Sequence, residues 1–227
     1  MKTTRTIRIA VLAACVGALI PAQTALAQSQ SYKDLATTWW QWVLSIPRTA
    51  NPLLDVTGER CMVGQRGDVW FLAGTFLPPN AVERACPVPS GTTLFFPVIN
   101  SVNFDTPGQC GQADPLPASF YRAAAAAFVD GAANLFVTLD GEPAGPMHRT
   151  QSPVFEVALP ADNLFVGFCN PDLRAGIYSP AVDDGIYVRL NPLPIGAHTL
   201  HIHAENPDQG FMVDVTYHLT IVPVVTK

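Results

Sequence analysis

Three histidines and an aspartate near the C-terminus have the types and spacing of metal ligands. His201 and His203 alternate with apolar residues, so in a β-strand both imidazoles point to one face, about 7 Å apart. If residues 205–210 close an antiparallel hairpin, Asp214 lies across from one of them, and His218 falls further along the same face. Two histidines and a carboxylate on one sheet face could bind a divalent transition metal such as zinc, iron or copper.

The same residues also fit a simpler interpretation. A sheet face that contacts water carries His, Thr and Asp because they are polar, and His–Asp pairs across strands stabilise a sheet modestly. His198 alternates with His201 and His203 in the opposite sense, so we expect it on the core side with a hydrogen-bond partner. The sequence alone leaves both interpretations of the polar face open.

The motifs of the common catalytic classes are absent. The chain has no GxSxG nucleophile elbow, no HExxH, no GxxxxGK[ST] and no GxGxxG after a strand. Hydrolase, zinc-protease and nucleotide-dependent classes therefore lose their usual sequence support, although a triad assembled from scattered residues is compatible with this result.

A cluster of tryptophans in the first helical segment is a second candidate site. Trp39 and Trp42 are three residues apart, so they share one helix face and are expected to pack on the end of a sheet. Trp40 falls on a different face. We expect it to be exposed, where its indole could stack on a sugar ring of a glycan.

The elements that position these residues begin after an expected leader. Residues 1–27 have a basic start, an apolar run too short to span a bilayer, and the small-x-small site Ala25-Leu26-Ala27, which together predict a cleaved signal peptide. The alternative is a lipoprotein anchored through Cys15, which follows Leu12-Ala13-Ala14. We expect a secreted or periplasmic protein.

Charge and hydropathy exclude several kinds of partner. The net charge is −5, and the expected leader carries basic residues only, so the mature chain is more acidic still. An acidic protein lacks the basic surface that nucleic acid or anionic lipid requires. No second hydrophobic stretch is long enough for a transmembrane segment.

The expected mature chain contains four cysteines. In an exported protein an even number predicts disulfides, here two, with three possible pairings. We favour Cys61–Cys86 and Cys110–Cys169, mainly because the first pair flanks two apolar runs that resemble a hairpin.

Two helices and about eight strands are expected in a single domain spanning residues 28–227. Ser31 and Asp34 form a capping box before a helix over residues 32–45, and Pro117 precedes an alanine-rich helix over residues 117–130. Both helices lie early in the chain, among strands separated by Pro- and Gly-rich turns. The pattern predicts a mainly β fold, a β-sandwich of jelly-roll or immunoglobulin-like type with two added α-helices.

The strands are expected around one central pair. Val69–Leu77 and Thr93–Asn100 are almost continuously apolar, which is typical of strands in the middle of a sheet covered on both faces. The remaining expected strands are Asn134–Leu139, Pro153–Leu159, Leu164–Cys169, Gly185–Leu190, His198–Ala204 and Phe211–Val222.

The segments TWWQWVLSIP, VWFLAGTF, CPVPSGTTLFFPVIN and GAHTLHI together resemble a group of uncharacterised secreted bacterial proteins. The resemblance covers nearly the whole mature chain and implies a single domain, but no activity and no catalytic residue.

The leading functional hypothesis is an exported β-sandwich that binds an extracellular small molecule or cell-envelope ligand, such as a glycan. The alternative is a metal-dependent enzyme that uses the polar face of the last hairpin. The expected metal ligands are His201, His203, Asp214 and His218.

Overall fold

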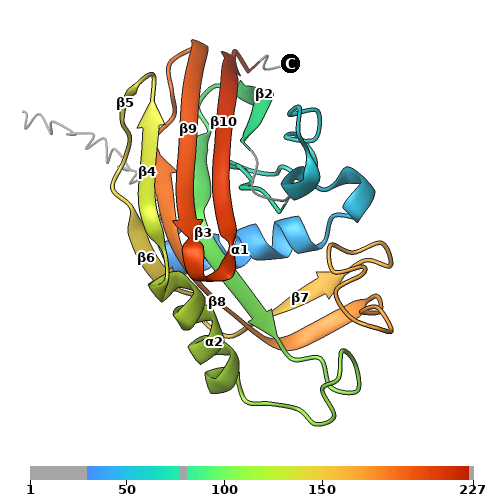
Figure 1. Ribbon diagram of the computed structural model, residues 1–227. Coiled ribbons are helices and arrows are strands. Elements are labelled where there is room, and N and C mark those ends of the chain that lie inside the picture. The colour runs from blue at the N-terminus through green and yellow to red at the C-terminus, as the bar shows by residue number, and fades with distance from the viewer. Residues whose placement is uncertain (1–29, 77–80, 225–227) are drawn as a thin grey trace, which may run out of the picture.

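Alternating apolar and polar residues form two β-sheets that pack face to face (Figure 1). The computed structural model describes residues 30–76 and 81–224. Its strands are β1 (Val69–Phe71), β2 (Val82–Pro89), β3 (Thr93–Phe104), β4 (Ala133–Leu139), β5 (Glu142–Pro143), β6 (His148–Gln151), β7 (Phe155–Leu159), β8 (Gly176–Leu190), β9 (Gly196–Asn206) and β10 (Phe211–Val222). The helices are α1 (Tyr32–Leu44) and α2 (Ala118–Asp130), with short 3-10 turns at Arg48–Ala50, Pro52–Leu54 and Pro207–Gln209.

The two sheets are mixed. Sheet A has the order β1-β3-β8-β6, and β7 pairs with another part of β8. Sheet B has the order β2-β10-β9-β4-β5, and β4, β9 and β10 can be followed side by side in Figure 1. Most neighbours are antiparallel, but β1–β3 and β2–β10 are parallel pairs.

Strand alternation builds the core between the sheets. In β9 and β10 every second residue is buried, which places Leu200, Ile202, Val213, Val215 and Tyr217 on the inner face of sheet B. These side chains pack against apolar residues of β3 and β8 in one cluster. The outer face of the same two strands carries the polar residues.

Sheet A is covered on both faces, as the continuous apolar sequence of β3 predicted. Phe96 belongs to the core between the sheets, whereas its neighbour Phe95 belongs to a second core beneath α1. Helix α1 begins at the predicted capping box, where the Ser31 hydroxyl accepts a hydrogen bond from the backbone N–H of Asp34. Its buried face contributes Trp39 to the second core.

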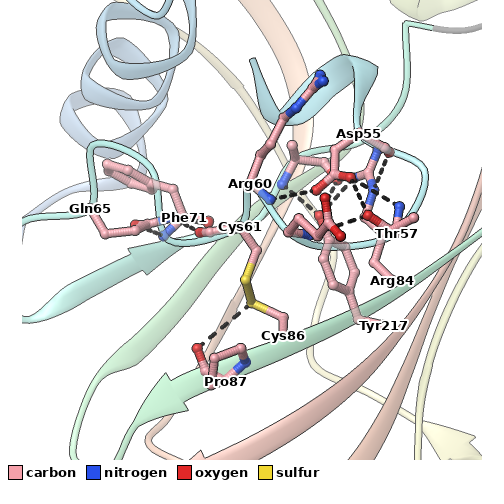
Figure 2. The surroundings of a disulfide bond; sticks show 12 residues. Asp55, Thr57, Arg60, Cys61, Gln65, Phe71, Arg84, Cys86, Pro87 and Tyr217 are labelled. Carbon is pink, nitrogen blue, oxygen red and sulfur yellow. Dashed lines mark hydrogen bonds between the residues drawn. A yellow bond between two sulfur atoms is a disulfide. The ribbon is translucent and has the colours of Figure 1, made fainter. Parts of the chain in front are cut away.

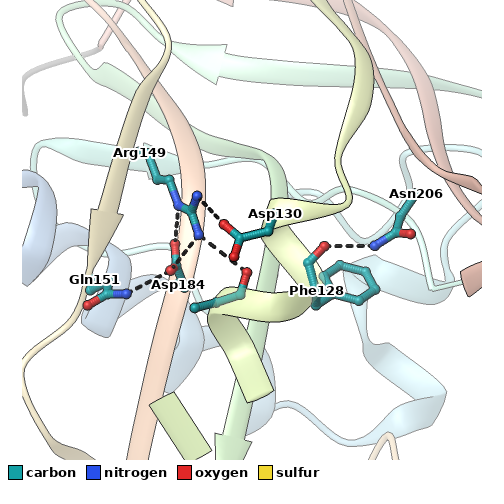
Figure 3. A network of polar contacts seen from close by, with 7 residues as sticks. Phe128, Asp130, Arg149, Gln151, Asp184 and Asn206 are labelled. Atoms are coloured by element: carbon teal, nitrogen blue, oxygen red, sulfur yellow. Dashed lines mark hydrogen bonds and ion pairs between the residues drawn. The ribbon is translucent and has the colours of Figure 1, made fainter. Parts of the chain in front are cut away.

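Polar contacts fix α2 to both sheets (Figure 3). Arg149 of β6 donates to Asp184 of β8 and to Asp130 at the end of α2, at 3.0 and 2.6 Å. These two carboxylates hold the pKa of the Arg149 guanidinium above its ordinary value. At the other side of the helix, Asn206 of β9 donates to the carbonyl of Phe128 at 2.7 Å.

The expectation of a mainly β sandwich with two added α-helices is confirmed, with ten strands in the described part of the chain. Both helices lie within a residue of their expected bounds. No described helix is long and apolar enough to cross a membrane. The expected signal peptide and Cys15 lie outside the described residues.

The expectation of a central strand over Val69–Leu77 is wrong for Val69–Phe76, and Leu77 lies outside the described residues. Strand β1 ends at Phe71 and lies at the edge of sheet A. Beyond it the backbone turns away, because the carbonyls of Ala73 and Gly74 accept hydrogen bonds from the buried guanidinium of Arg84, a residue of β2. After Phe71 the apolar character of this run therefore reflects burial and not strand pairing, with Leu72 in the core between the sheets and Ala73 in the core beneath α1.

A second expected strand, Leu164–Cys169, is a series of turns. The Asn163 side chain accepts a hydrogen bond from the backbone N–H of Phe165, which is the local bonding that lets asparagine start a turn. Gly167 follows with a φ of 89°, a conformation that glycine adopts without steric cost. Strands β2, β5 and β6 were not expected from the sequence.

Both favoured disulfides are present. Cys61 and Cys86 are joined with a Cα–Cα distance of 6.0 Å, and this bond ties the turn before β1 to β2 (Figure 2). Cys110 and Cys169 are joined with a Cα–Cα distance of 5.1 Å and connect the loop after β3 to the turns that precede β8.

Removing the first disulfide tests its contribution to stability. The Cys61→Ala, Cys86→Ala double variant should lose about 2–4 kcal/mol of unfolding free energy, because the cross-link restricts the unfolded chain over 25 residues. Urea unfolding of the wild type and the double variant gives this difference. A loss well below 1 kcal/mol would contradict it.

Candidate functional site

Three of the predicted metal ligands lie together on the outer face of sheet B. In the β9–β10 register Asp214 is opposite His203, and its carboxylate lies 2.7 Å from His201 Nε2. The side chains of His201, His203 and Asp214 are 33%, 13% and 25% exposed. One ligand atom of each lies within 4.8 Å of the others. We call these three residues the His–Asp cluster.

His218 shares this face but is outside the His–Asp cluster. It lies opposite Thr199 in β9, and its Nε2 is 3.3 Å from a carboxylate oxygen of Glu83 in β2. The alternation therefore placed His218 on the correct face, but its distance along the strand separates it from Asp214.

His198 has the hydrogen-bond partners expected for it. Its Nδ1 is 2.7 Å from Asp140 and its Nε2 is 3.0 Å from the carbonyl of Pro194. The Asp140 carboxylate raises the pKa of His198, and the same contact lowers the pKa of Asp140. Asp140 lies with Gly141 in the turn between β4 and β5, so its contact with His198 joins this turn to β9.

Trp40 is not the exposed platform expected from the helix pattern. Its side chain belongs to the second core, which lies beneath α1, and the residue is 6% exposed. The indole N–H donates to the carboxylate of Asp183 in β8 at 2.6 Å. The error arose because this helix packs against the protein on two sides, which a single apolar stripe does not indicate.

Trp40 nevertheless forms part of the wall of a pocket of about 510 Å³, which we call the aromatic pocket. Its aromatic lining residues are Trp39, Trp40, Phe76, Phe128, Phe165, Phe168 and Phe211. Polar side chains in the lining belong to Thr75, Asn100 and Ser101. Such a volume and lining are typical of sites for small molecules.

The pocket exists because β1 is short. That strand pairs with β3 only from Thr93 to Phe95, so the later part of β3, including Asn100, has no β1 residue beside it. After β1 the carbonyl of Gly74 accepts a hydrogen bond from Arg84, and the next two residues, Thr75 and Phe76, line the pocket. The same hydrogen bonds that ended the expected strand therefore shape the pocket.

Three phenylalanines form its rim. The rings of Phe76 and Phe168 stack with centroids 5.6 Å apart, and Phe165 contacts both edge to face. Phe168 is 64% exposed, which is unusual for so large an apolar side chain. The Cys110–Cys169 disulfide is adjacent to Phe168 and anchors the turn that carries it.

A buried acid supports the pocket wall from behind. Asp183 is fully buried and accepts hydrogen bonds from Trp40 and from the Tyr187 hydroxyl, at 2.6 and 2.8 Å. Asn100 in turn donates to the Tyr187 oxygen at 3.1 Å. Burial raises the pKa of Asp183 to about 7, and burial together with Asp183 raises the pKa of Tyr187.

Sequence reasoning missed the aromatic pocket, apart from Trp40. Its lining comes from seven separate segments, and no single one has a recognisable motif. The available signal was the pair Phe165 and Phe168 within a Pro- and Gly-rich stretch beside Cys169. Aromatic residues in a cross-linked turn have little core to occupy and can instead line a surface site.

No protein-family model matches the chain, and neither the curated proteins nor the solved structures contain a significant match to it. The two sites themselves therefore indicate what the protein can bind. The aromatic pocket can enclose an apolar molecule, and the His–Asp cluster can donate lone pairs to a cation.

Proposed function

We propose that this protein is exported and binds an extracellular or envelope-derived small molecule with an apolar body in the aromatic pocket. The observation that carries the proposal is the pocket of about 510 Å³ lined by Trp and Phe side chains. Burying apolar ligand surface there supplies binding free energy at roughly 25 cal/mol per Å².

The lining favours an apolar or aromatic ligand over a glycan. A sugar requires many hydrogen-bond partners, whereas the polar side chains here are limited to Thr75, Asn100 and Ser101. Trp40 presents only a small part of its indole, and its N–H is already bonded to Asp183. A few polar groups among apolar walls suit the orientation of one ligand group.

Hydrogen bonds behind the pocket wall hold the aromatic pocket in its shape before a ligand binds. Trp40 and Asn100 are both connected to the buried pair Asp183 and Tyr187 by hydrogen bonds. A wall fixed in this way loses little conformational entropy when a ligand binds, which favours affinity.

The two disulfides support the proposal that the protein is exported. Two disulfides form and persist in oxidising compartments outside the cytoplasm. This agrees with the signal peptide expected in residues 1–27. An exported binding protein encounters small molecules of the medium or the cell envelope.

Binding of the fluorescent probe N-phenyl-1-naphthylamine tests the pocket. Its emission should rise when the wild-type protein is added, and Phe168→Ala should weaken the affinity roughly tenfold, since the rim contributes about 1.4 kcal/mol of apolar contact. Phe120→Ala is the matched control, because Phe120 is an equally accessible phenylalanine of α2 outside the pocket. Equal affinities of the wild type and Phe168→Ala would contradict the proposal.

A further inference from the structure

The His–Asp cluster has neighbours that orient its histidines as metal ligands. Glu205 Oε1 lies 3.2 Å from His203 Nε2. Because a carboxylate oxygen accepts hydrogen bonds, this contact assigns the ring proton to Nε2 and leaves Nδ1 as the nitrogen with which His203 would bind a metal. Nδ1 faces the cluster, 3.7 Å from Asp214 Oδ2.

Glu205 is itself held in place. The Asn134 side-chain amide donates to Glu205 Oε2 at 2.8 Å, which fixes the carboxylate beside His203. Histidines that bind metals commonly donate their second ring N–H to a carboxylate, which fixes the tautomer and the ring orientation. The contacts of Asn134, Glu205 and His203 follow this arrangement.

Phe136 limits the rotation of both imidazoles. It lies opposite His203 in the β4–β9 register, and the two rings stack with centroids 4.8 Å apart and planes 15° apart. The edge-to-face contact with His201 has a centroid distance of 5.1 Å. Phe136 therefore restricts both imidazoles to orientations close to those of the cluster.

We propose that His201, His203 and Asp214 bind one divalent transition-metal ion, with Zn²⁺ as the probe. The ligands are His201 Nε2, His203 Nδ1 and an oxygen of Asp214. Tetrahedral zinc ligands lie roughly 3.4 Å apart, so small side-chain rotations from the present spacing within 4.8 Å suffice. His201 Nε2 faces the Asp214 carboxylate at 2.7 Å, so without metal it carries the ring proton. The metal ion takes the place of this proton, and bound His201 carries its proton on Nδ1.

The donor set decides the class of ion. Two imidazoles favour zinc and its transition-metal neighbours over magnesium and calcium, which prefer oxygen ligands. Three protein ligands leave a coordination position for water, as in catalytic zinc sites. No cluster residue lines the aromatic pocket, so this inference is independent of the proposed function.

Equilibrium dialysis of the chelator-treated protein against Zn²⁺, followed by elemental analysis, tests the site. We expect one Zn²⁺ per chain in the wild type and loss of stoichiometric binding in His203→Ala and in His201→Ala. Glu205→Gln should weaken the affinity roughly 10- to 100-fold, the usual effect of removing a partner behind a ligating histidine. Its urea midpoint without metal should equal that of the wild type, which separates a positioning role from a folding defect.

His218→Ala is the matched control, since it removes an exposed histidine of the same face that pairs with Glu83. It should retain one Zn²⁺ per chain. Failure of the wild type to bind stoichiometric Zn²⁺ would overturn the proposal. Equal binding by His203→Ala and the wild type, or equal losses in His218→Ala and His203→Ala, would also overturn it.

Discussion

Replacing Arg84 by alanine is expected to cost on the order of 3–5 kcal/mol of unfolding free energy. The residue is 1% exposed, although it carries a permanent charge. Its guanidinium donates to the carbonyls of Asp55, Ala73 and Gly74 and to the Tyr217 hydroxyl, at 2.7–2.9 Å (Figure 2). The alanine variant would leave buried acceptors without a donor and a cavity between the sheets.

Urea unfolding curves of the wild type and Arg84→Ala measure this loss, provided that both have the same slope. Arg66→Ala is the control, because Arg66 is exposed and should change stability by less than about 0.5 kcal/mol. Equal midpoints for Arg84→Ala and Arg66→Ala would show that the cost of burying the Arg84 charge cancels its hydrogen bonds.

Arg84 also explains why β2 was not predicted. The strand alternates strictly between buried and exposed residues, and its buried positions are Val82, Arg84, Cys86 and Val88. Because an arginine occupies one of the inward positions, the sequence of β2 lacks the regular apolar alternation from which strands are predicted. Its acceptors at Ala73 and Gly74 come from another segment, so no local pattern could reveal that the guanidinium has buried hydrogen-bond partners.

The last hairpin was predictable because its constraints are local. A period of two residues fixes the face of every side chain, and a short connection fixes the pairing of the strands. These rules placed His201, His203 and Asp214 together and Ile202 on the core side, as the structure confirms. They could not reveal Phe136, which reaches the cluster from β4 across a register shift.

The burial of Trp40 was not predictable from the sequence, because its hydrogen-bond partner is remote in the chain. A helix pattern identifies one apolar stripe, and Trp40 lies beside that stripe. The residue is buried because Asp183, 143 positions later in the chain, accepts its indole N–H. Only the pairing of β8 in sheet A brings that carboxylate beneath α1.

The buried carboxyl of Asp183 should make stability depend on pH. Burial raises its pKa in the folded protein to about 7, while the unfolded chain has the ordinary value of 3.8. Between these values the folded protein keeps a proton that the unfolded chain has lost, so stability falls as pH rises from about 4 to about 7. At 1.36 kcal/mol per pKa unit the fall amounts to roughly 4 kcal/mol.

Asp183→Asn isolates this effect, because the amide cannot ionise but can still accept hydrogen bonds from Trp40 and Tyr187. The charges nearest to Asp183, on Asp184 and Arg122, are present in both proteins and cancel in the comparison. Relative to Asp183→Asn, the wild type should lose roughly 4 kcal/mol of unfolding free energy between pH 4 and pH 8. Asp208→Asn removes an exposed carboxylate and controls for the loss of one negative charge. A difference between wild type and Asp183→Asn that stays constant with pH would mean that Asp183 is ionised throughout, and that the wall behind the aromatic pocket contains a buried charge.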